Sequence, residues 1–343
     1  MIRVGFILAY QSASWLGGVN YFRNLLDAIL SLPDRKIAPV VFLRKARDFE
    51  LTDFDGIEVI RSSLFDQFHP AWVIRKGVHS ILKNDFLLEK FLTRHKVDVL
   101  SHSGYLGPSS AIPAIGWIPD FQHVRRPDFF SPKTIQFRTH HFKALCDYCQ
   151  RIVLSSKDAL GDLQAFSPEA EAKSIVLNFV SCLTGVTKIP DRKSLEKRYN
   201  FRGTYFHVPN QFWVHKNHRV LIEALGLLKQ EDQNMLMLAT GSTFDSQCGN
   251  HTESLVALAK QMGVDKQFRI LGTIPYLDMI GLMAHSAAVI NPSLFEGWST
   301  SVEEARSLGK QIILSDIPVH REQNPPRSWF FAPTDAQSLT QIM

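Results

Sequence analysis

Two glutamates, Glu296 and Glu304, flank a predicted helix start in a stretch whose residue types suit ligand binding. An apolar strand is expected to end near Asn291, and a helix to begin near Thr300 or Ser301. Glu296 then lies in the loop above the carboxyl end of the strand, where open α/β sheets bind ligands. Free backbone N–H groups in the first helical turn, which also holds Glu304, attract a phosphate. The stretch therefore predicts a hydroxyl acceptor, a phosphate site and a second hydroxyl acceptor, the order of groups in a nucleotide-sugar.

The same residues allow a second interpretation, in which they only cap the helix. Ser301 and Glu304 have the spacing of a capping box, and so do Thr300 and Glu303. Such boxes are frequent at helix starts, so the local pattern leaves both interpretations open.

Other polar residues follow other predicted strands. Lys216 lies just before a predicted helix, where a long cationic side chain can meet phosphate charge. Asp120 and His123 follow a strand that ends near residue 118, and the histidine is either a site residue or part of a turn capped by Asp120. Gly17-Gly18 follows the first strand, where glycine lets the backbone approach a ligand closely.

The elements that must position these residues are short apolar runs alternating with helical patterns. Strands are expected at 3–9, 38–43, 97–101, 114–118, 151–155, 205–209, 235–240, 267–271, 287–291 and 311–315, and helices at 19–32, from 157, and at 218–229. This alternation predicts an α/β chain with parallel sheets. A charged stretch divides the pattern, which predicts two doubly wound domains, at 1–183 and 203–343, joined by a linker at 184–202.

Several motifs together resemble glycosyltransferase family 4, formerly grouped as glycosyl transferases group 1. Glu296 and Glu304 match its E-x7-E signature, and similar stretches lie at 116–123, 127–131, 210–218, 271–275 and 309–322. The resemblance begins at Gly17-Gly18 and runs to about Glu322. It implies a GT-B fold, that is, two Rossmann-like domains facing a cleft, with a retaining mechanism and no metal ion or cofactor.

The resemblance also implies roles for individual residues. Glu296 would hold hydroxyls of the transferred sugar, Glu304 would hold the ribose, Lys216 would neutralise the departing diphosphate, and His123 would lie beside the sugar. The remaining implied substrate-binding residues are Gly17, Gly18, Asp120, Asn210, Thr273, Ile274, Gly297, Trp298, Ser299, Thr300 and Ser301, of which the amides of 299–301 would face the diphosphate. Asn210 departs from the family pattern, which has an arginine there, so the positive charge is either weaker or supplied by Arg219 or another basic residue.

These roles predict a transferase that moves a sugar, a hexose such as mannose, from a UDP-, GDP- or ADP-sugar to a glycan or lipid-linked acceptor. Two alternatives stay open: a non-catalytic nucleotide-sugar-binding scaffold and a GT-B epimerase. A dinucleotide-dependent dehydrogenase is disfavoured because Gly17-Gly18 does not fit G-x-G-x-x-G.

Composition narrows the partners. The net charge of +5, without a dense basic block interleaved with aromatics, argues against nucleic acid as a partner. The lone CxxC of Cys146 and Cys149 is expected to pack in the core rather than bind zinc. No apolar run is long enough to span a membrane, and a cytoplasmic location is expected.

Two stretches carry further expectations. Six basic residues lie among apolar ones at helical spacing in 71–96, which predicts solvated helix faces or, alternatively, a peripheral contact with the inner face of the membrane. A helix begins after Thr334 and is cut off by the end at Met343, so the last helix is either truncated or short.

Overall fold

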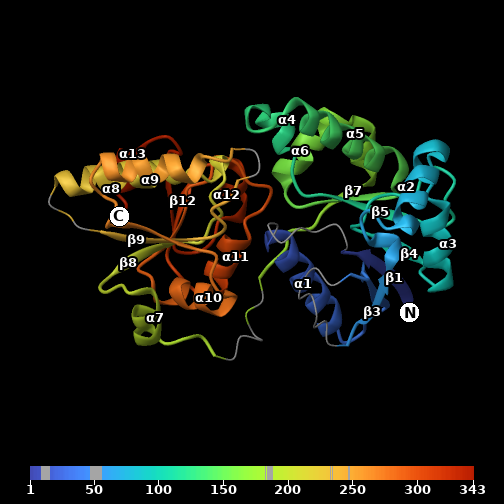
Figure 1. Cartoon of the computed structure of the whole chain (residues 1–343), viewed down its shortest axis with the longest axis horizontal. Coiled ribbons are helices and arrows are strands. Elements are labelled where there is room, and N and C mark those ends of the chain that lie inside the picture. The colour runs from blue at the N-terminus through green and yellow to red at the C-terminus, as the bar shows by residue number, and fades with distance from the viewer. Residues whose placement is uncertain are drawn as a thin grey trace. The chain divides into compact units, whose positions relative to one another are not determined.

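The computed structural model describes residues 1–8, 16–46, 56–181, 183, 188–231, 233, 235–245 and 248–343. The chain forms two compact units: unit 1 is Met1–Phe121 with Pro132–Phe179, and unit 2 is Gln122–Ser131 with Val180–Met343. Each unit has a parallel sheet covered by helices (Figure 1). No helix among the described residues is long and apolar enough to cross a membrane.

Unit 1 contains a seven-stranded parallel sheet in the order β3-β2-β1-β4-β5-β6-β7. Its strands are β1 (Ile2–Ile7), β2 (Ile37–Arg44), β3 (Glu58–Ser62), β4 (Val99–Ser101), β5 (Ala114–Ile118), β6 (Arg151–Leu154) and β7 (Ser174–Val176). The helices of the same stretch of chain are α1 (Leu16–Ser31), α2 (Pro70–Leu82), α3 (Phe86–Arg94), α4 (Gln122–Arg125, grouped with unit 2), α5 (Pro132–Tyr148) and α6 (Lys157–Phe166).

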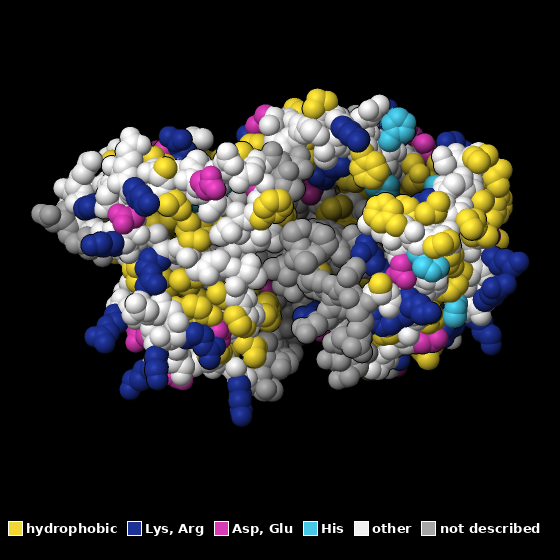
Figure 2. Space-filling model, viewed as in Figure 1, with side chains coloured by type: hydrophobic (Ala, Val, Ile, Leu, Met, Phe, Trp, Pro, Cys, Tyr) yellow, Lys and Arg dark blue, Asp and Glu magenta, His cyan; other side chains and the backbone are white. Residues whose placement is uncertain are grey.

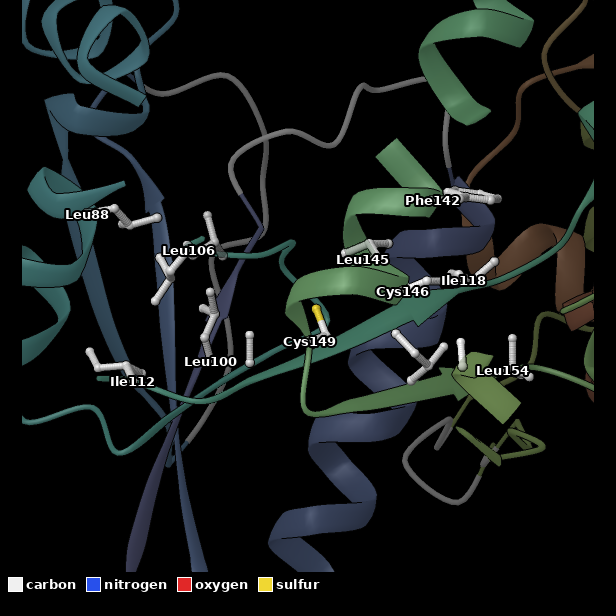
Figure 3. Close-up of a cluster of buried hydrophobic side chains, with 14 of the residues drawn as sticks. Leu88, Leu100, Leu106, Ile112, Ile118, Phe142, Leu145, Cys146, Cys149 and Leu154 are labelled. Atoms are coloured by element: carbon white, nitrogen blue, oxygen red, sulfur yellow. The ribbon is translucent and has the colours of Figure 1, made fainter. Parts of the chain in front are cut away.

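Alternate residues of the strands pack on opposite faces of this sheet. Phe6 packs in the cluster with α1, whereas its neighbour Ile7 belongs to the cluster with α3, α5 and α6, as the two-residue repeat of a strand requires. Cys146 and Cys149 are buried in the second cluster (Figure 3), which confirms their packing role. Burial raises the pKa of the Cys149 thiol to about 12.

Unit 2 contains a six-stranded parallel sheet in the order β10-β9-β8-β11-β12-β13, the Rossmann arrangement. Its strands are β8 (Tyr205–Val208), β9 (Leu236–Thr240), β10 (Phe268–Gly272), β11 (Val289–Asn291), β12 (Ile312–Ser315) and β13 (Ser328–Phe331). Its remaining helices are α7 (Arg192–Tyr199), α8 (His218–Gln230), α9 (His251–Gln261), α10 (Tyr276–His285), α11 (Thr300–Ser307), α12 (Pro318–Gln323) and α13 (Ala336–Thr340).

The expected linker at 184–202 differs from the structure in its second half. Helix α7 lies there, begins with the Asp191 side chain accepting from the Ser194 amide, and buries Leu195 against α10 and β8. Residues 184–187 lie outside the described residues. The charged composition of α7 reflects its solvent-facing side, and the helix is held on unit 2 by Leu195 and by hydrogen bonds from Arg198 and Tyr199 to Asp278.

Candidate functional site

The strongest candidate site lies at the switch point of the second sheet. β8 and β11 are neighbours there, and the strands added after each extend the sheet in opposite directions. Open sheets bind ligands outside the carboxyl ends of such a pair. Asn210 follows β8 and donates from Nδ2 to Oδ1 of Asn291, the last residue of β11, at 3.0 Å. The predicted residues Lys216 and Glu296 thus come from the two loops that open at this point.

Hydrogen bonds join these two loops. The Leu294 amide donates to the His215 carbonyl at 2.7 Å, and Asn217 Nδ2 donates to the Pro292 carbonyl at 3.0 Å. Asn217 has φ 54°, a left-handed conformation that asparagine adopts more readily than most residues. The loop after β8 is therefore tied to the loop that carries Glu296.

Lys216 and Glu296 form an ion pair that is largely shielded from solvent. Lys216 Nζ lies 2.6 Å from Glu296 Oε1, and their side chains are 15% and 8% exposed. Ser293 Oγ lies 2.6 Å from the same carboxylate oxygen. Burial alone would raise the pKa of Glu296, but Lys216, His215 and His320 together outweigh it and the pKa is lowered. Glu296 is therefore an anion at neutral pH, aimed at a cation.

The start of α11 lies between the two glutamates, as predicted, but it is not a capping box. Ser299 is the N-cap, and its side chain makes no capping hydrogen bond in this fully described helix. Its amide donates instead to Gln323 Oε1 at 3.2 Å. The capping interpretation is thus wrong, and of the three predicted amides those of Thr300 and Ser301 are the ones in the first helical turn.

Glu304 lies in α11 with its carboxylate buried. It accepts a hydrogen bond from Tyr276 OH at 2.9 Å, and only 3% of the residue is exposed. Burial raises the pKa of Glu304 to about 7, against a smaller lowering by Tyr276. Its neighbour Glu303 faces another way and accepts from Gln323 Nε2 at 2.9 Å.

We expect Glu304→Gln to stabilise the protein more at pH 8 than at pH 5. A raised pKa means that the carboxyl contributes stability in its neutral form, which is lost as pH rises from 4.5 through about 7. An amide keeps the shape and never ionises, so the gain at pH 8 should approach ~3 kcal/mol. Thermal unfolding midpoints of both proteins across this range test it, and an equal difference at both pH values would contradict it.

The remaining predicted residues of unit 2 are placed as follows. Gly297 and Trp298 are half-buried in the loop between Glu296 and α11, and Thr273 and Ile274 connect β10 to α10, next to Tyr276. The sequence alternative in which Arg219 replaces the missing arginine finds no support. Its Nε donates to Glu223 Oε1 at 2.7 Å on the surface of α8, and its side chain is 68% exposed.

The four predicted residues of the N-terminal half are placed as follows, and only the two glycines differ from the expected loop. Gly17 and Gly18 lie in the first turn of α1 rather than in a loop. Asp120 accepts from Arg138 at 2.7 Å in unit 1. His123 is buried in α4, within the segment grouped with unit 2, and Phe129 of that segment contacts the ring of His215 with centroids 6.1 Å apart.

Sequence reasoning missed the residues that hold the site together. Tyr276 and Gln323 are far from Glu304 and Ser299 in the chain, so no local pattern pairs them. His320 is a third case: it is buried behind the loop of Glu296, with Nδ1 2.9 Å from the Ser315 carbonyl, and burial lowers its pKa to about 4. Its position in the 309–322 stretch was the only available signal.

Comparisons with known proteins identify the fold. The chain resembles a solved glycosyltransferase from Rickettsia africae (15% identity, TM-score 0.67, 99% of this chain and 86% of that chain). It also resembles Anabaena Alr3699/HepE in complex with UDP and glucose (16%, 0.69, 100% and 89%) and sucrose-phosphate synthase from Thermosynechococcus elongatus (14%, 0.72, 99% and 88%). No curated protein sequence matches it. The chain therefore has the GT-B fold, and its residues 196–343 match the family described as Glycosyl transferases group 1.

Proposed function

We propose that the protein is a retaining glycosyltransferase that moves a sugar from a nucleoside-diphosphate sugar to a glycan or lipid-linked acceptor without a metal ion. The observation that carries this proposal is the Lys216–Glu296 ion pair at the switch point of the second sheet, beside the start of α11. The family match of residues 196–343 to Glycosyl transferases group 1 supports the same class of reaction.

The chemistry of the pair suits a donor whose diphosphate departs. A lysine and a helix start can balance the charge that grows on the leaving group, where other enzymes use a metal ion. When a donor enters, we expect Lys216 to turn toward the diphosphate and the Glu296 carboxylate to accept hydroxyls of the sugar. Glu304 and its partner Tyr276 are proposed to bind the ribose hydroxyls.

We propose a UDP-sugar as the first donor to test, before GDP- and ADP-sugars, because the similar HepE structure is a complex with UDP and glucose. Testing several sugars on the preferred nucleotide, mannose included, would identify the hexose that is transferred. The proposed location is the cytoplasm.

We expect transfer with the preferred donor to continue in excess EDTA. The reason is that Lys216 and the amides of α11 are proposed to carry the diphosphate charge. The measurement is release of the nucleoside diphosphate and of glycosylated acceptor, with and without chelator. Complete loss that Mn²⁺ or Mg²⁺ restores would contradict the metal-independent mechanism.

The non-catalytic scaffold is a second candidate because Asn210 stands where the family has an arginine. The Asn210 side-chain amide donates a hydrogen bond to Asn291 and, unlike an arginine, adds no positive charge to the site. Saturable donor binding without transfer or hydrolysis would favour the scaffold.

A further inference from the structure

Helix α2 of unit 1 turns its apolar side outward. Val73, Ile74 and Ile81 are exposed, Ile74 by 60% and Ile81 by 80%. Their three- and four-residue spacing, continued by Gly77, places them on one face of the helix. The only buried residue of this fully described helix is Arg75. A surface helix normally does the opposite and packs its apolar stripe on the core.

A buried ion pair anchors the inner side of α2. Arg75 pairs with Asp85 at 2.8 Å, and the two side chains are 4% and 3% exposed. The Arg75 guanidinium also donates to the Leu64 carbonyl and lies 5.7 Å from the ring centre of Phe65. Because a buried ion pair adds little net stability, an inward apolar stripe would serve the fold at least as well. The stability of unit 1 therefore does not explain why the apolar side chains of α2 face outward.

The outward face is open and continues past both ends of the helix. A side-chain carbon added at Gly77 would meet no atom within 4 Å. Phe68, just before the helix, is 82% exposed and has φ 67°, an uncommon backbone conformation for a bulky residue. Leu82 and Phe86 extend the apolar area toward α3. Figure 2 shows hydrophobic side chains gathered over the part of unit 1 where Figure 1 labels α2.

The surroundings of this face are basic. Lys83, Lys90 and Arg94 are exposed at the end of α2 and along α3. Residues 68–96 contain six basic and two acidic side chains. Of the two acids, Asp85 is buried against Arg75, and Glu89 accepts from the Ala111 amide. The charge that this area presents to solvent is therefore positive.

We propose that the outer face of α2, made of Val73, Ile74, Ile81 and the flanking Phe68, docks unit 1 on an anionic lipid bilayer. An apolar stripe bordered by lysine and arginine is the pattern of a helix that lies in the membrane interface. The apolar side chains enter the headgroup layer, and Lys83 and Lys90 meet the lipid phosphates. The inference stands apart from the sugar chemistry, because it uses no residue of the proposed donor site.

The test is co-sedimentation of the full chain with vesicles of phosphatidylcholine alone and of phosphatidylcholine with 30% phosphatidylglycerol. We expect binding to the anionic vesicles, and at least about tenfold weaker binding by Ile74→Glu/Ile81→Glu and by Lys83→Glu/Lys90→Glu. A matched control, Leu32→Glu/Val256→Glu, changes two exposed apolar residues outside the patch and should bind like the unchanged protein. Thermal unfolding of each variant confirms that it is folded.

Three outcomes would overturn the proposal. The first is failure of the unchanged protein to bind anionic vesicles, and the second is equal binding by the folded Ile74→Glu/Ile81→Glu variant. The third is a concentration-dependent dimer that this variant abolishes, which would make a second copy of the chain the occupant. Because no sugar donor is present in the assay, each result is independent of whether the protein transfers a sugar.

Discussion

Glu296→Gln is expected to reduce sugar transfer by about 100-fold or more while the protein stays folded. The carboxylate is kept ionised by Lys216 at 2.6 Å and is positioned by Ser293, at the carboxyl end of β11. An amide has nearly the same shape, but it cannot pair with the lysine or accept hydroxyls with the strength of an anion. The effect should therefore fall on kcat as well as on KM.

The control for this variant is Glu303→Gln. Glu303 is also buried near the start of α11, but it accepts a hydrogen bond from Gln323, which an amide oxygen can equally accept. We expect Glu303→Gln to keep transfer within a few-fold of the unchanged protein. Near-normal turnover of a folded Glu296→Gln protein would remove Glu296 from the site.

Lys216→Ala is expected to reduce kcat/KM by about 100-fold, whereas Arg219→Ala should leave it within about twofold. Lys216 lies in the site, and Arg219 pairs with Glu223 on the outside of α8. If Arg219→Ala loses activity while Lys216→Ala retains it, the assignment of the lysine is wrong.

The Lys216→Ala substitution should also lower the stability of the protein, so a second variant is needed to separate the two effects. Removing Lys216 leaves the buried Glu296 carboxylate without its cation, so its pKa should rise and the protein should lose ~3 kcal/mol at neutral pH. In Lys216→Ala/Glu296→Gln the unpaired charge is gone, and we expect most of this loss to be recovered. The double variant should nevertheless stay inactive, which separates a role in the reaction from a role in folding.

The central strands of both sheets could be predicted because local apolar patterns in the sequence indicate them. The strand expected at 114–118 matches β5 residue for residue, and those at 205–209 and 311–315 are one residue longer than β8 and β12. Strands β3, β7 and β13 were not expected. All three are edge strands with at most one buried residue, so they lack the longer apolar runs that mark the central strands.

The parts of the candidate site that are formed by residues close in sequence could be predicted. The contacts between residues that the sheet brings together from distant parts of the chain could not. Glu296 and Glu304 follow from one loop and one helix, whereas the Asn210–Asn291 bond joins residues 81 positions apart. Similarly, Ser301 and Glu304 have capping-box spacing, but Gln323 from α12 binds the Ser299 amide and Tyr276 binds Glu304. Tertiary partners thus displaced the local pairing that the spacing suggested.

The most direct measurement of the central claim is calorimetric titration of UDP-, GDP- and ADP-sugars, in EDTA, into the unchanged protein and into Lys216→Ala/Glu296→Gln. The site at the ends of β8 and β11 predicts that one donor class binds the unchanged protein with one site per chain. It also predicts that the folded double variant binds this donor at least about tenfold more weakly. Binding of no donor class to the unchanged protein, or equal binding by the double variant, would contradict the assignment of this site.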